Sequence, residues 1–231
     1  ALTNWIISLQ DADGGLWGGY AANGTRISKI AEGNIDAFNA ISGYTSFHQK
    51  LLAYFNNVRW DRTDKLLIAW AENPKYKYAL DVHSWSYCIF EDFPTDVLSK
   101  TSRFKTTQTS TITKTPISGY CFDEDRDVVW LEGTGQIVVA FIKAKMESEA
   151  QMFLKEMKKN MIKSASFSGS YALPYSANFG TSYGEDALWT GVDTNPAVSS
   201  TVWYLFGMLR FDPLALGYSK NIPAEDKFWT K

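Results

Sequence analysis

The stretch Val129-Trp130-Leu131-Glu132-Gly133-Thr134-Gly135-Gln136 places an acidic residue at the start of an apolar helix, and the chain repeats this arrangement. Glu32 opens the stretch Glu32-Gly33-Asn34-Ile35-Asp36-Ala37-Phe38, and Asp81 lies in Leu80-Asp81-Val82-His83-Ser84-Trp85. A loop rich in Gly or aromatic residues precedes each stretch, and a more polar helical segment follows it. The repeat predicts stacked helical hairpins, each with a carboxylate at one end.

Apolar periodicity predicts the helices, which we place at about 2–10, 34–45, 46–58, 80–91, 94–108, 130–145, 147–164 and 196–210. Four of them, 34–45, 80–91, 130–145 and 196–210, combine small and apolar residues on all faces, so we expect them to be buried inside. Their partners have a polar side and belong outside. Residues 65–70 are expected to pair as a short strand. Alternating inner and outer helices predict a single all-α domain over residues 1–231, an α/α toroid.

Composition excludes several classes of protein. At 231 residues and 45% hydrophobic content the chain can bury a substantial core. Its formal charge of −2 does not indicate the basic surface that binds nucleic acid. The longest apolar stretch, around 137–142, is far shorter than a membrane-spanning helix needs. Cys88 and Cys121 lie in apolar surroundings, which favours buried free thiols, although a disulfide between them stays open. The two Cys and two His show no ligand spacing, so we expect no metal and no cofactor.

Five motifs together resemble the successive helix starts of bacterial (α/α) toroid proteins of the six-hairpin glycosidase type. They are Ser8-Leu9-Gln10 with Asp13-Gly14-Gly15, the Glu32 stretch, Ala79 to Trp85, Val129 to Gln136, and Ser199-Ser200-Thr201-Val202-Trp203-Tyr204-Leu205-Phe206. The resemblance covers nearly the whole chain. Such barrels have about six hairpins, whereas about four inner helices can be counted here. A partial ring is therefore expected, completed by a further domain or chain if this sequence is the C-terminal portion of a larger barrel.

The resemblance implies activity on a carbohydrate in the central cavity. Glycoside hydrolysis needs two carboxyl groups about 5–9.5 Å apart, one protonated and one ionised. Neighbouring helices pack about 8–10 Å apart, so acids at their ends fall in that range. The catalytic candidates are Glu32, Asp36, Asp81 and Glu132.

Glu132 is the preferred general acid. It follows Trp130, whose ring would desolvate the carboxyl group, and it precedes two glycines that would let backbone approach a ligand. Asp81 or Glu32 would then act as base or nucleophile. The alternative is that each acid in a first helical turn only offsets the helix dipole and caps free N–H groups. In that case the chain is a noncatalytic glycan-binding or scaffold module.

Aromatic residues supply a second argument for a sugar ligand. They make up 15% of the chain, and many lie in loops, where flat amphipathic rings suit the C–H faces of sugars. The alternative is that the loops bury these rings as small cores of their own. The expected substrate-binding residues are Trp17, Tyr20, Trp85, Trp130, Tyr175, Trp189 and Trp203.

Two other chemistries have less support in the sequence. The acidic run 123–127 lacks the Gly and Glu of an EF-hand, and a terpenoid cyclase would carry such a run on an inner helix, so a solvated acidic turn is the simpler interpretation. A polysaccharide lyase would need a Tyr or His base and a cation to hold a uronate, roles that Tyr20 and Arg26 would fill. The cellular compartment stays open, and a location outside the cytoplasm is favoured if the protein acts on glycans.

Overall fold

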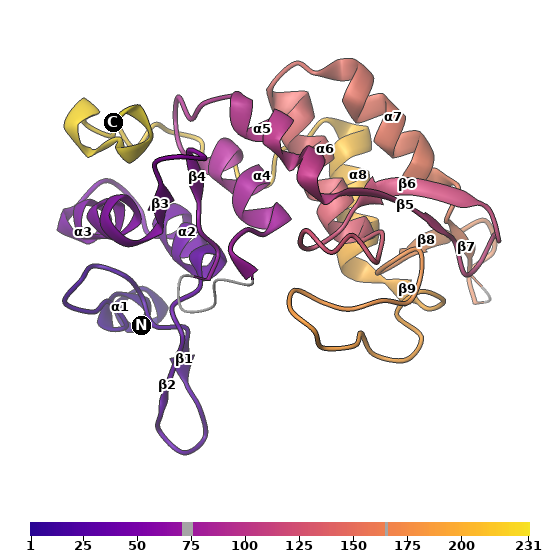
Figure 1. The fold of residues 1–231 in the computed structure, drawn as a ribbon, viewed down its shortest axis with the longest axis horizontal. Coiled ribbons are helices and arrows are strands. Elements are labelled where there is room, and N and C mark those ends of the chain that lie inside the picture. The colour runs from indigo at the N-terminus through magenta and orange to yellow at the C-terminus, as the bar shows by residue number, and fades with distance from the viewer. Residues whose placement is uncertain (71–75, 165) are drawn as a thin grey trace. The chain divides into compact units, whose positions relative to one another are not determined.

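The protein combines helices with four small antiparallel sheets, in a computed structural model that describes residues 1–70, 76–164 and 166–231 (Figure 1). The prediction of an all-α toroid is therefore wrong. The described residues divide into two compact units. The first unit comprises Ala1–Tyr78, Trp85–Pro94 and Leu214–Lys231, and the second comprises Ala79–Ser84 and Thr95–Pro213.

The first unit contains the helices α1 (Leu2–Ser8), α2 (Ala31–Ala40) and α3 (Ser46–Tyr54), with α3 continuing as a π-helical turn at Phe55–Arg59. Helix α4 (Leu80–Ile89) contributes its later turns to this unit. Two hairpins complete it: β1 (Gly19–Tyr20) pairs with β2 (Arg26–Ile27), and β3 (Trp60–Asp61) pairs with β4 (Leu66–Leu67). The predicted strand within 65–70 is thus confirmed by β4.

An aromatic core holds the first unit together. Phe228, in the short 3₁₀ turn Phe228–Thr230, is completely buried among Phe55, Trp60, Phe90, Phe93 and Trp229, at ring-centroid distances of 4.9–6.2 Å. The segment that carries Phe228 is also tied down by polar contacts, because Lys220 Nζ donates to the Ile41 carbonyl (2.5 Å) at the end of α2. Residues near the end of the sequence therefore complete a core formed by Phe55, Trp60, Phe90 and Phe93.

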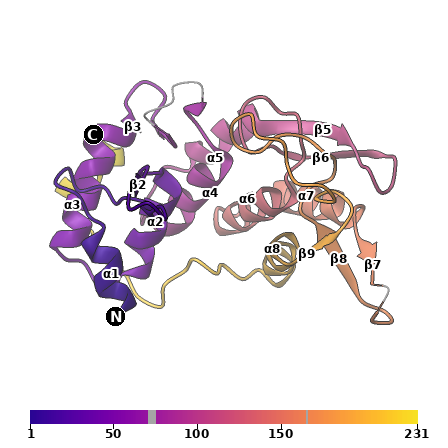
Figure 2. The same cartoon turned by 90° about the horizontal axis from the view of Figure 1, so that it is seen from below.

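The second unit is built on α6 (Leu131–Lys143), which packs against both α7 (Glu147–Lys158) and α8 (Val198–Leu209) (Figure 2). Every residue from Gly133 to Phe141 is buried, as expected for an inner helix. Helix α8 differs from the prediction: only Ser200, Tyr204 and Gly207 are buried. Small residues set the close approach, since a Cβ at Gly207 would lie 2.8 Å from Val138.

Strands replace part of a predicted helix in the second unit. Helix α5 (Asp96–Lys100) and a 3₁₀ turn (Thr101–Phe104) are followed by β5 (Lys105–Thr109), which pairs with β6 (Pro116–Tyr120). The Thr-rich run is β-branched and so favours a strand over a helix. A three-stranded sheet of order β7-β8-β9 is formed by Ile162–Lys163, Tyr171–Pro174 and Pro196–Ala197.

Both cysteines are buried thiols, as the sequence predicted. Within the described residues, the helices are all too short or too polar to cross a membrane.

Candidate ligand-binding pocket

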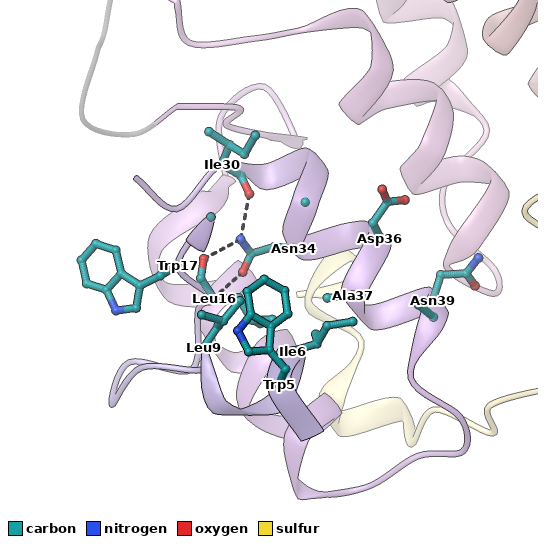
Figure 3. Close-up of a pocket in the computed structure, with 13 residues that line it drawn as sticks. Trp5, Ile6, Leu9, Leu16, Trp17, Ile30, Asn34, Asp36, Ala37 and Asn39 are labelled. Atoms are coloured by element: carbon teal, nitrogen blue, oxygen red, sulfur yellow. Dashed lines mark hydrogen bonds between the residues drawn. The ribbon is translucent and has the colours of Figure 1, made fainter. Parts of the chain in front are cut away.

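A pocket of about 400 Å³ lies in the first unit between α1, the loop that follows it, and α2. Helix α1 supplies Trp5 and Ile6, the residue that follows it supplies Leu9, and α2 supplies Asp36, Ala37 and Asn39. Figure 3 shows Asp36, Ala37 and Asn39 along α2, with the Trp5 indole ring and Ile6 beside them. Apolar side chains thus form much of the wall, with a few polar groups among them, as in most small-molecule sites.

Asn34 of α2 fixes the loop that forms one side of the pocket. Its Oδ1 accepts from the Leu16 N–H (2.7 Å), and its Nδ2 donates to the carbonyls of Leu16 (3.1 Å) and Ile30 (2.7 Å). The side chain is almost completely buried. All these hydrogen bonds go to backbone, so Asn34 shapes the pocket wall rather than contacting a ligand.

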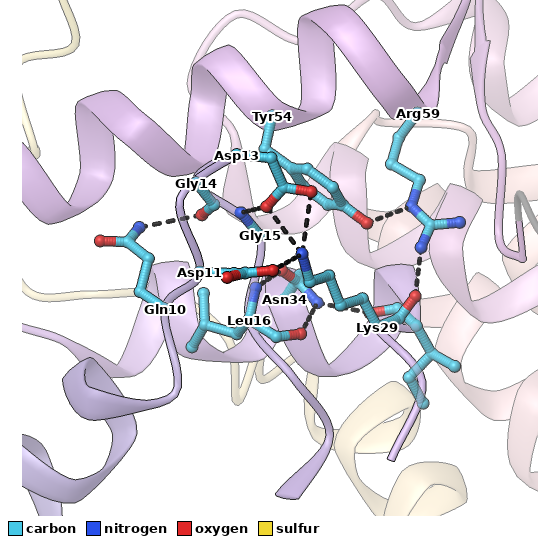
Figure 4. A network of polar contacts seen from close by, with 11 residues as sticks. Gln10, Asp11, Asp13, Gly14, Gly15, Leu16, Lys29, Asn34, Tyr54 and Arg59 are labelled. Carbon is cyan, nitrogen blue, oxygen red and sulfur yellow. Dashed lines mark hydrogen bonds and ion pairs between the residues drawn. The ribbon is translucent and has the colours of Figure 1, made fainter. Parts of the chain in front are cut away.

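A charged network supports the same loop (Figure 4). The Lys29 ammonium, itself buried, donates to Asp11 Oδ2 (2.7 Å) and to both carboxylate oxygens of Asp13 (2.8 Å). It also lies 4.4 Å from the centroid of the Trp17 ring, and the Arg26 guanidinium lies 5.1 Å from that ring. Two cations of the protein therefore lie against the Trp17 ring. Trp17 lines the pocket, but its ring already has these partners and is not open for a sugar to stack on.

The glycines of the Asp13-Gly14-Gly15 motif are required by this packing. Gly14 has φ +93°, and a Cβ there would lie 2.1 Å from the Lys50 carbonyl oxygen. A Cβ at Gly15 would lie 2.7 Å from the ring of Tyr54, whose hydroxyl accepts from Arg59 Nε (2.7 Å). Arg59 is completely buried and also donates to the Lys29 carbonyl. The motif thus has a structural role in the first unit.

Three further residues that line the pocket carry polar groups. The Trp17 indole N–H and Asn39 Oδ1 are buried, and neither has a hydrogen-bond partner among the described residues. Asn39 is held in place through its other group, because Nδ2 donates to the Leu214 carbonyl (3.0 Å). Asp36 is exposed, and Figure 3 shows its carboxyl group directed away from Trp5 and Ile6.

Asp36 has an unusual acidity for an aspartate. Although part of the residue is open to solvent, loss of hydration around the carboxyl group raises its pKa to about 6, and the negative charge of Glu32 adds to the shift. Glu32 lies one helical turn before Asp36, where side chains at i and i+4 are neighbours. Asp36 therefore exchanges its proton near neutral pH.

The other predicted catalytic acids have different surroundings. Glu32 is half-buried and is not among the residues that line the pocket. Asp81 Oδ1 accepts from the N–H of Val82 (2.7 Å), a contact within its own helix. Glu132 is half-buried, and burial raises its pKa against the effect of a hydrogen bond with Ser199. That the four acids share one cavity stays a prediction, and of the four only Asp36 lines this pocket.

The glycines that follow Glu132 do not serve the predicted purpose. A Cβ at Gly133 would lie 2.1 Å from the Trp130 ring, and one at Gly135 would lie 2.7 Å from Trp203 Cβ. Gly133 makes room for the Trp130 ring, and Gly135 allows α6 to approach α8 closely at Trp203.

The predicted aromatic contacts divide between the two units. Only Trp17 lines the pocket, while Tyr20 is exposed on β1 opposite Arg26, and Trp85 is half-buried in α4. In the second unit Trp130 is buried and stacks on Phe122 at 4.1 Å, and Tyr175 contacts Trp189 at 4.8 Å. Trp189 is exposed, and Trp203 is half-buried against Phe206. Trp130 is thus explained by core packing.

One group of side chains has atoms of the types that hold metals. Cys121 Sγ and carboxylate oxygens of Asp125 and Asp127 lie within 4.8 Å of one another. These acids already accept hydrogen bonds from Thr181 (2.8–3.1 Å). Burial also raises the pKa of the Cys121 thiol to about 12, which opposes the thiolate that metals bind. Hydrogen bonding within this acidic turn therefore explains why the three side chains lie close together.

Trp5 and Asn39 are pocket residues that sequence reasoning missed. Trp5 lies within the predicted helix 2–10, and only the structure shows that it is 52% exposed at the pocket. Nothing in the sequence around Asn39 indicates that it lines a pocket. Its position in the pocket depends on how the loop folds back onto α2.

Comparison of the sequence with models of protein families and with curated proteins gives no match.

Proposed function

We propose that the first unit binds a carbohydrate in the pocket between α1 and α2. The observation that carries the proposal is an exposed indole ring on a pocket whose wall combines apolar side chains with a few polar ones. Trp5 is 52% exposed at the pocket, and Asn34, Asp36 and Asn39 are polar residues among those that line it. Sugar rings present C–H faces to aromatic rings and hydroxyl groups to such donors and acceptors.

The size of the pocket is consistent with this proposal. A volume of about 400 Å³ falls at the lower end of the usual range for small-molecule sites, roughly 300–1,000 Å³. It suits one or two sugar residues rather than a long chain.

A binding assay with matched variants tests the proposal. A panel of oligosaccharides is titrated calorimetrically into the wild-type protein, into Trp5→Ala and into Asn39→Ala. Both variants should lose at least about tenfold in affinity, which corresponds to about 1.4 kcal/mol. The control is Trp189→Ala, since Trp189 is 58% exposed but lies in the second unit, outside the pocket.

Two results would overturn the proposal. One is that no sugar of the panel binds to the wild-type protein. The other is that Trp189→Ala abolishes binding while Trp5→Ala leaves it intact, because the ligand would then bind the second unit.

A second candidate is hydrolysis of a glycoside, with Asp36 as general acid. The observation that favours it is the pKa of about 6 at Asp36, with Glu32 one turn away as a second carboxylate. General acids of glycosidases have pKa values raised in this way. Because Glu32 does not line the pocket, binding is the first candidate.

Release of reducing ends from the oligosaccharides that bind tests the second candidate. Turnover should fall as the pH rises above about 6, where Asp36 loses its proton, and Asp36→Asn should abolish it. Turnover that survives in Asp36→Asn would contradict this role.

A further inference from the structure

Helix α8 has the sequence of a helix that is covered on every side. From Val198 to Leu209 it carries no charged residue, and its polar residues are the small Ser and Thr and one Tyr. Helices that are apolar all round are normally buried all round. In the structure only Ser200, Tyr204 and Gly207 are buried, and a Cβ at Gly207 would meet Val138 of α6. One side of α8 therefore packs within the second unit and the other side does not.

The uncovered side carries a regular apolar row. Val198, Val202, Leu205 and Leu209 follow one another at spacings of four, three and four residues, and we call them the α8 stripe. At 3.6 residues per turn the stripe points away from the buried side of the helix. Val198 is 80% exposed and Leu209 is 73% exposed. This spacing is that of the seam along which two helices pack side by side.

The apolar surface extends beyond the stripe. Met208 and Phe211 are also more than half exposed, and Phe211 packs against Phe206 at 5.4 Å. The exposed side chains of this surface together present roughly 500 Å², which is in the upper part of the range of about 300–600 Å² for the largest apolar patch on a monomer. Patches of this size mark interaction sites more often than they occur by chance.

The area and the charge of the surface favour a second copy of the same chain as its occupant. A standard interface buries about 800 Å² on each partner, with an apolar core and a polar rim. The stripe with Met208 and Phe211 has the size of such a core, and the exposed Thr194 and Asn195 before the helix are polar. A two-fold contact requires one surface to fit itself. A stripe without charge meets that condition, because identical charged groups would repel each other.

We infer that the α8 stripe joins two copies of this chain. A two-fold axis that crosses the helix between Val202 and Leu205 pairs the two α8 helices antiparallel. Each apolar row then packs into the other, and the dipoles of the two helices oppose each other favourably. The inference does not depend on the pocket of the first unit or on what that pocket binds.

Sedimentation velocity tests the inference on the whole chain. The mass is recorded at chain concentrations from about 1 to about 300 μM, since an interface below the standard size associates weakly. The average mass should rise with concentration towards twice the 26.0 kDa of one chain.

Two variants place a charge in the stripe. Leu205→Glu and Leu209→Glu should each raise the dissociation constant of the dimer by about a hundredfold or more, because two carboxylates would be buried in every dimer without a partner. The matched control is Met152→Glu on α7, since Met152 is 42% exposed and Leu205 is 47% exposed in the same unit. The control should dimerise as the wild type does. Far-UV circular dichroism should be the same for all four proteins, because each substituted side chain is exposed.

Three results would overturn the inference. One is a mass of one chain at every concentration. Another is a dimer that persists in both stripe variants, because a different surface would then join the copies. The third is that Met152→Glu weakens the dimer as much as Leu205→Glu does, since added negative charge alone would then explain the effect.

Discussion

Replacement of Phe228 by Ala should strongly destabilise the first unit. The Phe228 ring has no exposed surface and contacts five aromatic residues, with Trp229 at 4.9 Å and Trp60 at 5.2 Å as the nearest. Truncation removes the apolar contacts of a whole ring and leaves a cavity that rigid aromatic neighbours cannot fill. Such Phe→Ala changes cost about 3–5 kcal/mol of unfolding free energy.

Urea unfolding, followed by tryptophan fluorescence and far-UV circular dichroism, measures this loss. The matched control is Phe167→Ala, because Phe167 is 71% exposed, and its removal should change the unfolding free energy by less than about 0.5 kcal/mol. Phe228→Leu keeps much of the apolar volume, so it should retain the fold and lose less than the Ala variant. A loss below about 1 kcal/mol in Phe228→Ala would refute the reasoning that this residue closes the core.

Three further predictions concern titration and reactivity. The pKa of Asp36 is raised to about 6 from the ordinary 3.8, so the native state holds more protons than the unfolded state between about pH 4 and 6. Stability should therefore fall as the pH rises through that window, and unfolding midpoints measured against pH should show a weaker fall in Asp36→Asn. Burial lowers the pKa of His83 to about 3 from 6.5, so its imidazole should show no NMR titration between pH 8 and 4, and a signal that titrates near 6.5 would contradict its burial. Iodoacetamide should leave Cys88 and Cys121 unmodified in the native protein and alkylate both in urea, whereas rapid native labelling would show that the thiols are accessible.

Local patterns predicted most helices well. The starts expected at about 46, 80 and 130 compare with Ser46, Leu80 and Leu131 in the structure. Helix starts are indicated by residues close in sequence, namely the spacing of apolar residues and the loop residues that precede each helix. Helix α2 begins at Ala31, earlier than expected, and its N–H there donates to the distant Ala69 carbonyl (3.1 Å). Contacts with distant residues moved that boundary.

The wrong fold class has a specific physical origin. Residues 105–108 were included in the predicted helix 94–108, although Thr106 and Thr107 are β-branched. Their hydrogen-bond partners are in 116–120, and sequence spacing within the segment does not reveal that pairing. Short hairpins of two-residue strands, such as β1–β2, also leave too few residues for an alternating pattern to show.

The candidate site was predicted only in part. Asp36 and Trp17 were named from the sequence and line the pocket, whereas Trp5 and Asn39 were not. The preference for Glu132 as the acid rested on two glycines that the structure assigns to packing against Trp130 and Trp203. A glycine after an acid is compatible with both roles, and only the position of the indole rings distinguishes them.

The most direct test of ligand binding in the first unit is a titration followed by NMR. The indole N–H signals of the tryptophans are recorded while the tightest-binding oligosaccharide is added to the protein. Carbohydrate binding in the pocket predicts shifts of the Trp5 and Trp17 signals, with those of Trp189 and Trp203 unchanged. Shifts confined to Trp189 and Trp203, or no shift of any indole signal at saturating ligand, would contradict it.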